Sequence, residues 1–147
     1  MPATVAEKLF TKGLGALLQG DILSALSCFE KAIEMENNPV YCSYFAYCIA
    51  RERGQFNKAI SLCAEAIKTE PENSIHYLNL GRIYLLINKK TDAVETFREG
   101  LKHETNEQII DELNKLGTRK TPVIPFLKRS NPLNKYLGII LKVLRLR

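Results

Sequence analysis

The sequence has no tryptophan, only two histidines and no closely spaced cysteine pair, and these gaps exclude several kinds of site. The four cysteines lack the CxxC spacing of zinc or redox motifs. The two histidines, His76 and His103, lie far apart, so we expect no metal and no cofactor. No apolar run reaches the roughly 20 residues that a membrane-spanning helix needs. Lys8 and Lys12 interrupt the apolar residues near the amino terminus, which is untypical of a secretory signal. We therefore expect a cytoplasmic protein with reduced thiols.

Acidic residues are also missing from the last part of the chain. After Glu112 there are nine Lys or Arg residues and no Asp or Glu. Up to Glu112 there are 12 basic and 16 acidic residues, a balance of −4. An acidic body is thus followed by a basic tail, which indicates that the two parts do different work.

A signal for ending a helix recurs every 34 residues. Glycine and asparagine best tolerate the left-handed backbone that ends a helix. An alanine follows each signal by five positions and allows two helix backbones to approach closely. Apolar residues between the signals follow helical spacing. The three signals are Gly20, Gly54 and Asn88, and the alanines are Ala25, Ala59 and Ala93. The spacing predicts three helix pairs over about residues 6–39, 40–73 and 74–107.

The third of these units is the most regular. It has an aromatic residue, then Leu-Gly and tyrosine, followed by alanine, phenylalanine and glycine: Tyr77, Leu80, Gly81, Tyr84, Ala93, Phe97 and Gly100. At a 34-residue period this pattern resembles the tetratricopeptide repeat family. The resemblance covers about residues 6–107 and implies an all-α fold, a right-handed solenoid of antiparallel helix pairs. Three positions depart from the family pattern, because Lys12 and Ala46 replace large residues and Cys63 replaces phenylalanine.

Two further segments follow the repeats. Residues 105–108 resemble a capping box, so we expect a helix over 106–117 that covers the third repeat and completes a domain of residues 1–117. Residues 118–147 form a basic tail, with three prolines followed by an amphipathic helix. This tail resembles one found on some bacterial repeat proteins, which favours a bacterial origin. We expect it to contact the repeats, or to be exchanged in a homodimer, through Phe126, Leu137, Ile140, Leu141 and Leu144.

The sequence gives little support for catalysis. Gly13, Gly15 and Gly20 do not have the spacing of a phosphate-binding loop. Cys42 and His76 occupy equivalent places one repeat apart, at about 10 Å if the helices pack in the usual way. A nucleophile and its base need hydrogen-bond contact. We therefore predict no enzymatic activity and no catalytic residue.

The family resemblance implies that the first helix of each repeat lines a concave groove. The side chains turned away from the small-residue stripe would form a largely apolar surface with two arginines on the first helices of neighbouring repeats. An alternative is that some of them belong to the core or to a dimer contact. These side chains are Phe10, Leu14, Leu17, Tyr41, Tyr44, Cys48, Arg51, Ile75, Leu78, Arg82 and Leu85.

Members of the family that bind chaperones hold a terminal carboxylate with Lys, Asn and Arg. Here the matching places hold Phe10, Leu14, Phe45 and Ile75, and only Asn79 is polar. The resemblance therefore does not imply such a clamp. An apolar or aromatic peptide with an acidic group for one of the two arginines fits better.

The sequence is compatible with three functions. The leading prediction is a non-enzymatic scaffold that binds a protein or peptide partner in the groove. The alternative is a peripheral membrane adaptor, attached to an anionic surface by the basic amphipathic helix at the carboxyl terminus. Nucleic-acid binding by the same charges is the weakest, because the acidic body would repel phosphate.

Overall fold

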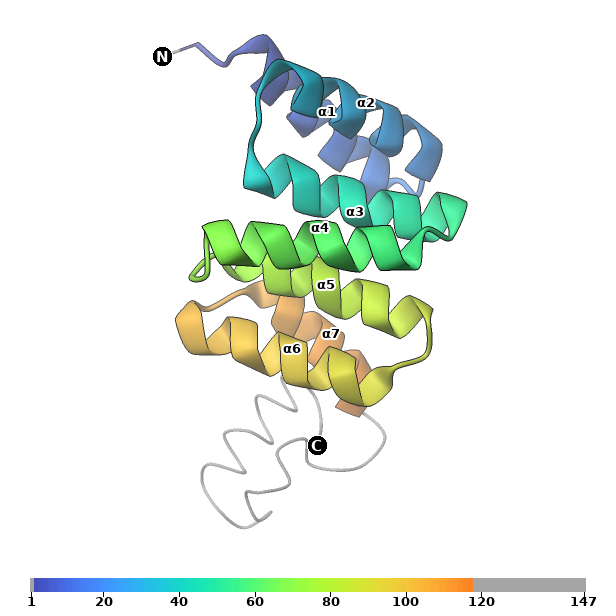
Figure 1. Cartoon of the computed structure of the whole chain (residues 1–147), viewed down its shortest axis with the longest axis vertical. Coiled ribbons are helices and arrows are strands. Elements are labelled where there is room, and N and C mark those ends of the chain that lie inside the picture. Colours follow the sequence, from blue (N-terminus) through green and yellow to red (C-terminus); the bar gives the residue numbers. More distant parts are fainter. Residues whose placement is uncertain (1, 118–147) are drawn as a thin grey trace. The chain divides into compact units, whose positions relative to one another are not determined.

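The computed structural model describes residues 2–117, which form helices joined by short turns (Figure 1). Within that range there are seven helices and no strand, so the prediction of an all-α fold is confirmed. The helices are α1 (Val5–Leu18), α2 (Ile22–Met35), α3 (Pro39–Arg53), α4 (Phe56–Thr69), α5 (Ser74–Leu86), α6 (Lys90–His103) and α7 (Glu107–Gly117). The predicted tail contacts, from Phe126 to Leu144, lie outside the described residues.

The three predicted helix-ending turns have the expected backbone. Gly20, Gly54 and Asn88 adopt left-handed conformations, with φ angles of 79°, 65° and 59°. Gly54 is the C-cap of α3, and its N–H donates to the carbonyl of Ala50. Because glycine and asparagine carry the smallest steric penalty in this region, these positions fix the ends of α1, α3 and α5.

Asparagines cap three helices, and at two of them the sequence favours a neighbouring residue instead, Ser74 for α5 and Thr105 for α7. At α3, the Oδ1 of Asn38 accepts from the N–H of Val40 and proline follows, as the sequence predicts. For α5 the cap is Asn73 rather than Ser74. For α7 the side chain of Asn106 accepts from two N–H groups, so Asn106 rather than the predicted capping box caps this helix. In each case the short asparagine amide reaches an N–H two residues ahead.

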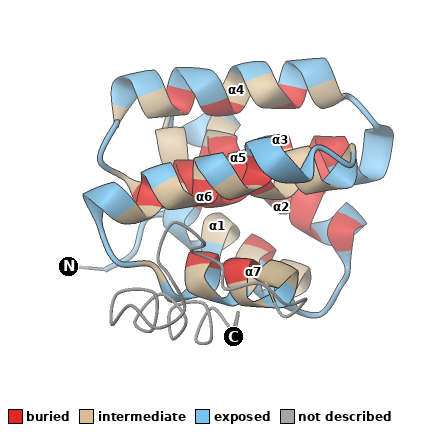
Figure 2. Ribbon diagram, turned by 90° about the horizontal axis from the view of Figure 1, so that it is seen from below, coloured by how far each residue is buried: buried red, intermediate tan, exposed pale blue. Residues whose placement is uncertain are grey.

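The chain divides into two compact units, Met1–Glu99 and Gly100–Arg147. In the first unit, consecutive helices are joined at alternating ends and run antiparallel (Figure 1). Helix α3 contacts α2, α4 and α5, and Figure 2 shows buried residues along these elements. Their common core includes Leu26, Phe29, Ile49 and Ile83. In the second unit, α7 buries Ile109 and Leu113.

Small and large residues are exchanged at one equivalent helix crossing. In the first and third repeats, Gly13 lies against the ring of Phe29 and Gly81 against Phe97, and a Cβ atom on either glycine would overlap the ring. In the second repeat these two places hold a large residue on the first helix and a small one on the second, Tyr47 and Cys63. The exchange keeps the crossing filled, because a protein interior has little room for either a void or an extra group.

Candidate partner-binding surface

The predicted groove residues divide into core and surface side chains. Four of them are buried: Tyr41, Tyr44, Cys48 and Leu78, at 4%, 5%, 0% and 0% exposure. The burial of Tyr44 favours the alternative that this residue belongs to the core. Arg51 is exposed. The other six predicted residues are partly buried: Phe10, Leu14, Leu17, Ile75, Arg82 and Leu85.

An aromatic cluster explains why the tyrosines are buried. The ring of Phe10 stacks on Tyr41 at 4.7 Å between centroids and meets Tyr44 edge-on at 5.6 Å. Phe10 and Tyr44 both lie close to the ring of Phe29, at 5.5 and 5.7 Å. Tilted and stacked pairs at these distances add to the stability gained from burial. Position 44 therefore joins α1, α2 and α3 and is not offered to a partner.

The two predicted arginines meet at one tyrosine. The guanidinium carbon of Arg51, on α3, lies 5.7 Å from the ring centroid of Tyr47, and that of Arg82, on α5, lies 5.8 Å from it. The Nη1 of Arg51 also donates to the hydroxyl of Tyr47 at 3.1 Å. Distances below about 6 Å are those of cation–π interactions. We call Arg51, Tyr47 and Arg82 the arginine–tyrosine cluster.

Tyr47 was not among the predicted site residues. It occupies the place that glycine holds in the other two repeats. This departure from the repeat pattern is the sequence feature that could have identified it. A bulky residue at a small-residue position needs a reason, and an arginine four residues later lies on the same helix face. Side-chain contacts across α3 and α5 were needed to place Arg82 on the same ring.

The two arginines of the cluster influence the pKa of two buried neighbours, Tyr44 and Cys48. Burial raises the pKa of the Tyr44 hydroxyl, and Arg82 opposes that shift. Burial raises the pKa of the Cys48 thiol to about 12, with Arg51 again acting in the opposite direction. Both effects indicate positive potential on this part of α3 and α5.

Known proteins share this architecture. The family model described as tetratricopeptide repeat matches residues 50–113. The small glutamine-rich tetratricopeptide repeat-containing protein of Dictyostelium discoideum is 33% identical over 105 residues, which are 71% of this chain. The chain carries tetratricopeptide repeats. The first predicted repeat, residues 6–39, lies before the stretch that the family model matches.

The curated relatives are longer proteins from eukaryotes. Protein 2 of the same name from Mycosarcoma maydis is 29% identical over 106 residues, 71% of this chain. The chain spans only 31% and 30% of the lengths of these two relatives. The bacterial origin and cytoplasmic location that we expected stay predictions.

Solved tetratricopeptide repeat structures have the same fold. The first such domain of human RPAP3 is 25% identical, with a TM-score of 0.61 over 76% of this chain and 89% of that one. The Sgt2 domain from Aspergillus fumigatus is 20% identical, with a TM-score of 0.62 over 89% of this chain and 84% of that one. The first domain of Spaghetti (RPAP3), bound to the HSP90 peptide SRMEEVD, is 24% identical, with a TM-score of 0.59 over 79% and 93%.

A buried polar network, which the repeat pattern does not predict, joins the second and third repeats. The Nδ1 of His76 lies 3.0 Å from the hydroxyl of Ser43, and its Nε2 lies 2.8 Å from a carboxylate oxygen of Glu70. The amide nitrogen of Asn79 donates to the same hydroxyl at 3.2 Å. Burial lowers the pKa of His76, and the bond to Glu70 opposes this.

The order serine, histidine and carboxylate matches that of a nucleophilic triad, but its surroundings do not suit catalysis. Ser43 and His76 are both fully buried, so no substrate carbonyl reaches the hydroxyl. A triad also needs space beside the nucleophile for the reacting atom. The network instead satisfies polar groups between α3 and α5, which fixes how the two repeats pack.

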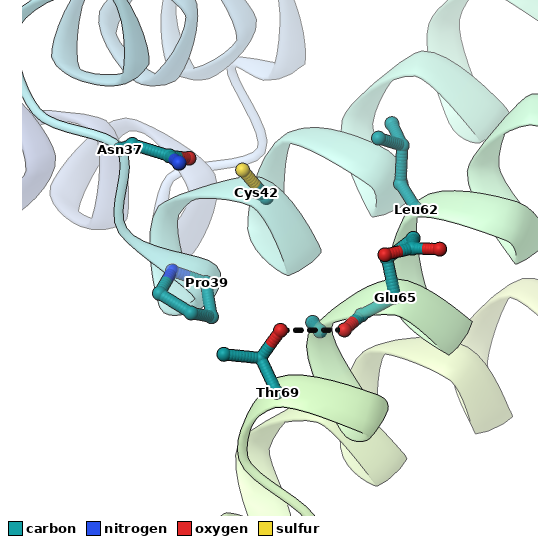
Figure 3. A pocket seen from close by; sticks show the side chains of 7 residues that line it. Asn37, Pro39, Cys42, Leu62, Glu65 and Thr69 are labelled. Atoms are coloured by element: carbon teal, nitrogen blue, oxygen red, sulfur yellow. Dashed lines mark hydrogen bonds between the residues drawn. The ribbon is translucent and has the colours of Figure 1, made fainter.

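One pocket of about 280 Å³ lies between the start of α3 and the second half of α4 (Figure 3). Its lining includes Cys42, Leu62 and Glu65, with the hydroxyl of Thr69 turned back to the carbonyl of Glu65. Burial raises the pKa of the Cys42 thiol, so the reactive thiolate is disfavoured. The pocket contains none of the predicted groove residues.

Residues 2–117 lack two other kinds of site. No group of three or more His, Cys, Asp or Glu side chains there is placed to hold a metal ion. In the same residues, no helix combines the length and apolar character needed to cross a bilayer.

Proposed function

We propose that this chain is a non-enzymatic interaction scaffold, and that the first helices of its repeats hold a peptide segment of a partner protein. The observation that carries the proposal is a row of accessible side chains at equivalent positions of α1, α3 and α5. Leu17, Arg51 and Leu85 are spaced by 34 residues, and each is partly or fully exposed. We call them the outer row.

The outer row has the composition of a peptide-binding surface. Two leucines flank an arginine, so apolar contacts and one strong directional group are offered together, as in helical-groove and extended-peptide recognition. The row that includes Tyr44 and Leu78 is buried or partly buried beneath it. A firm core under the exposed row keeps its geometry fixed, which lowers the ordering cost of binding.

The related Spaghetti domain supports a peptide ligand in general terms, since it was determined with an HSP90 peptide. The identity of that peptide is not carried over to this chain. Here the places that match the terminal-carboxylate clamp hold apolar side chains, apart from Asn79, which is fully buried.

The test is a selection from a displayed library of 12-residue peptides, with the full chain as bait. We expect capture to be lost in the variant Leu17→Gln/Leu85→Gln. The matched control is Leu18→Gln/Leu86→Gln, which changes the next residue of each helix, at 85% and 41% exposure. Thermal unfolding checks that both variants fold. Equal loss in the two variants, or no enriched peptide with the unmodified chain, would contradict the proposal.

The membrane adaptor remains a second candidate on the charge pattern of residues 118–147 alone, which are not described by the structure. If it is right, the full chain sediments with vesicles containing phosphatidylserine and not with neutral vesicles. Replacing Lys135, Lys142 and Arg145 by glutamine would then release it. Sedimentation that ignores both lipid charge and these substitutions would exclude this function.

A further inference from the structure

We propose that the bound peptide carries an internal acidic side chain, a carboxylate or a phosphoryl group, which is held by Arg51 and Arg82 at the ring of Tyr47. This inference rests on the proposed function and specifies the chemistry of the partner. It places the recognised anion within the peptide and not at its carboxyl terminus.

The cluster holds two cations at one aromatic ring. Each guanidinium carbon lies within 6 Å of the ring centroid of Tyr47, so the negative face of the ring offsets part of the repulsion between the two charges. One N–H of Arg51 is used by the Tyr47 hydroxyl, but a guanidinium has five donors. Because Arg51 is exposed, its remaining donors are accessible to an oxyanion.

The bond to Tyr47 also orients Arg51. A long exposed side chain normally loses conformational freedom when it binds, which reduces the affinity gained. Here the hydroxyl and the ring already restrict the guanidinium. A ligand anion therefore meets a charge that is held in place before binding.

The sequence provides for this cluster in one repeat only. In the first and third repeats the place of Tyr47 is a glycine that lies against a phenylalanine. A tyrosine fits in the second repeat because the facing residue is Cys63, which is small and fully buried. The same exchange that fills the helix crossing thus supplies the ring that gathers the two arginines.

The charges of the chain favour an acidic occupant from outside it. Among the residues that the structure describes, Arg51 has no ion pair, and its guanidinium contacts Tyr47. Residues 113–147 carry nine positive and no negative side chains. That segment would be repelled by the cluster, whereas an acidic peptide would be attracted.

A terminal carboxylate is a poorer match. Asn79 is the one polar residue at the places used by the terminal clamp, and it is fully buried. Its amide nitrogen is committed to the Ser43 hydroxyl. The cluster is formed by other positions: Tyr47 and Arg51 follow Phe45 by two and six residues on α3, and Arg82 follows Asn79 by three on α5. The recognised anion is therefore placed within the body of the peptide.

The experiment measures binding of the full chain to fluorescent 12-residue peptide pools by anisotropy. Every pool is amidated at its carboxyl terminus and differs only at a fixed central residue, which is Glu, phosphoserine, Gln or Lys. A further Gln pool keeps a free terminal carboxylate. We expect the Glu or the phosphoserine pool to bind about tenfold more tightly than the amidated Gln pool, and the Lys pool to bind most weakly. If the Glu pool binds more tightly than the phosphoserine pool, the cluster recognises a carboxylate; the reverse order indicates a phosphoryl group.

Two variants locate the effect. Arg51→Gln/Arg82→Gln should reduce binding of the acidic pools to the level of the Gln pool. The charge-matched control Arg53→Gln/Lys58→Gln changes two exposed cations outside the cluster and should retain the preference. Tyr47→Phe keeps the ring and removes the acceptor for Arg51, so a loss of a few-fold is expected.

The outcomes separate this inference from the proposed function. If the Glu, phosphoserine and Gln pools bind equally and the arginine variant changes nothing, while the outer-row variant abolishes binding, peptide binding stands and the acidic preference is wrong. Tight binding of the free-carboxylate pool alone also overturns the inference. If no pool binds the unmodified chain, both proposals fail.

Discussion

Two glycines on α1, Gly13 and Gly15, give a direct test of the packing, because alanine should have opposite effects on the free energy of unfolding at the two positions. A Cβ atom on Gly13 would overlap the buried ring of Phe29, whereas a Cβ atom on Gly15 would meet nothing within 4 Å. Both lie inside the helix. Alanine at either place gains about 0.5–1 kcal/mol from helix propensity.

The magnitude at Gly13 follows from two opposing terms. Forcing an extra methyl group into a filled core costs about 1–3 kcal/mol. After the propensity gain is subtracted, Gly13→Ala should lower the free energy of unfolding by up to about 2 kcal/mol. Gly15→Ala should raise it by about 0.5–1 kcal/mol.

The assay is urea unfolding of the full chain, followed by circular dichroism at 222 nm. A double-mutant cycle with Phe29→Leu isolates the contact, since a smaller side chain should relieve the overlap in the Gly13→Ala background. A favourable coupling of about 0.5 kcal/mol or more is expected for residues in contact. If Gly13→Ala proves as stable as Gly15→Ala, the close approach of α1 and α2 is not as described.

Two other predictions concern the core of the first unit. Ala59 is fully buried, so Ala59→Leu should lower the free energy of unfolding in urea by about 1–3 kcal/mol. The same change at Ala64, which is exposed on the same helix, should have little effect. Similar losses at both sites would contradict the packing of α4. Burial lowers the pKa of His76 from its ordinary 6.5, and Glu70 opposes this shift. As the pH falls, the unfolded chain therefore takes up a proton at this histidine before the folded chain does. The free energy of unfolding should then decrease as the pH drops below about 6.5. His76→Gln should flatten this dependence between pH 7 and 5, and His103→Gln, at an exposed site, should not; an unchanged slope in His76→Gln would show that other groups cause it.

The repeat period made much of the fold predictable. Positive-φ turns, alanines at helix crossings and the ends of helices are local properties, so the 34-residue spacing was enough to locate them. The caps of α5 and α7 were misplaced by one residue because asparagine stands next to Ser74 and Thr105, and all three residue types can cap. Local propensity does not decide between neighbouring caps.

The site was harder to predict because it depends on contacts between helices. Helical spacing places Tyr44 and Arg51 on one side of α3, yet it does not say that Phe10 and Phe29 enclose the tyrosine ring. The network of Ser43, His76 and Asn79 likewise needs α3 beside α5. Position within a repeat identifies the face of a helix, whereas burial on that face is set by the side chains of its neighbours.

The exchange at Tyr47 and Cys63 separates folding from recognition. Tyr47→Gly/Cys63→Phe would restore in the second repeat the glycine–phenylalanine pair of the other two repeats. Because the total volume at the crossing is nearly kept, the double variant should be more stable than Cys63→Phe alone, in which a phenylalanine and a tyrosine compete for one space. It would also remove the ring that holds Arg51 and Arg82.

Urea unfolding and the peptide pools together measure both effects. We expect the double variant to unfold as cooperatively as the unmodified chain and to lose the roughly tenfold preference for acidic pools. The Gln pool should bind as before, since the outer row is untouched. If the acidic preference survives without Tyr47, the two arginines act independently of the ring, and the tyrosine is there for packing alone.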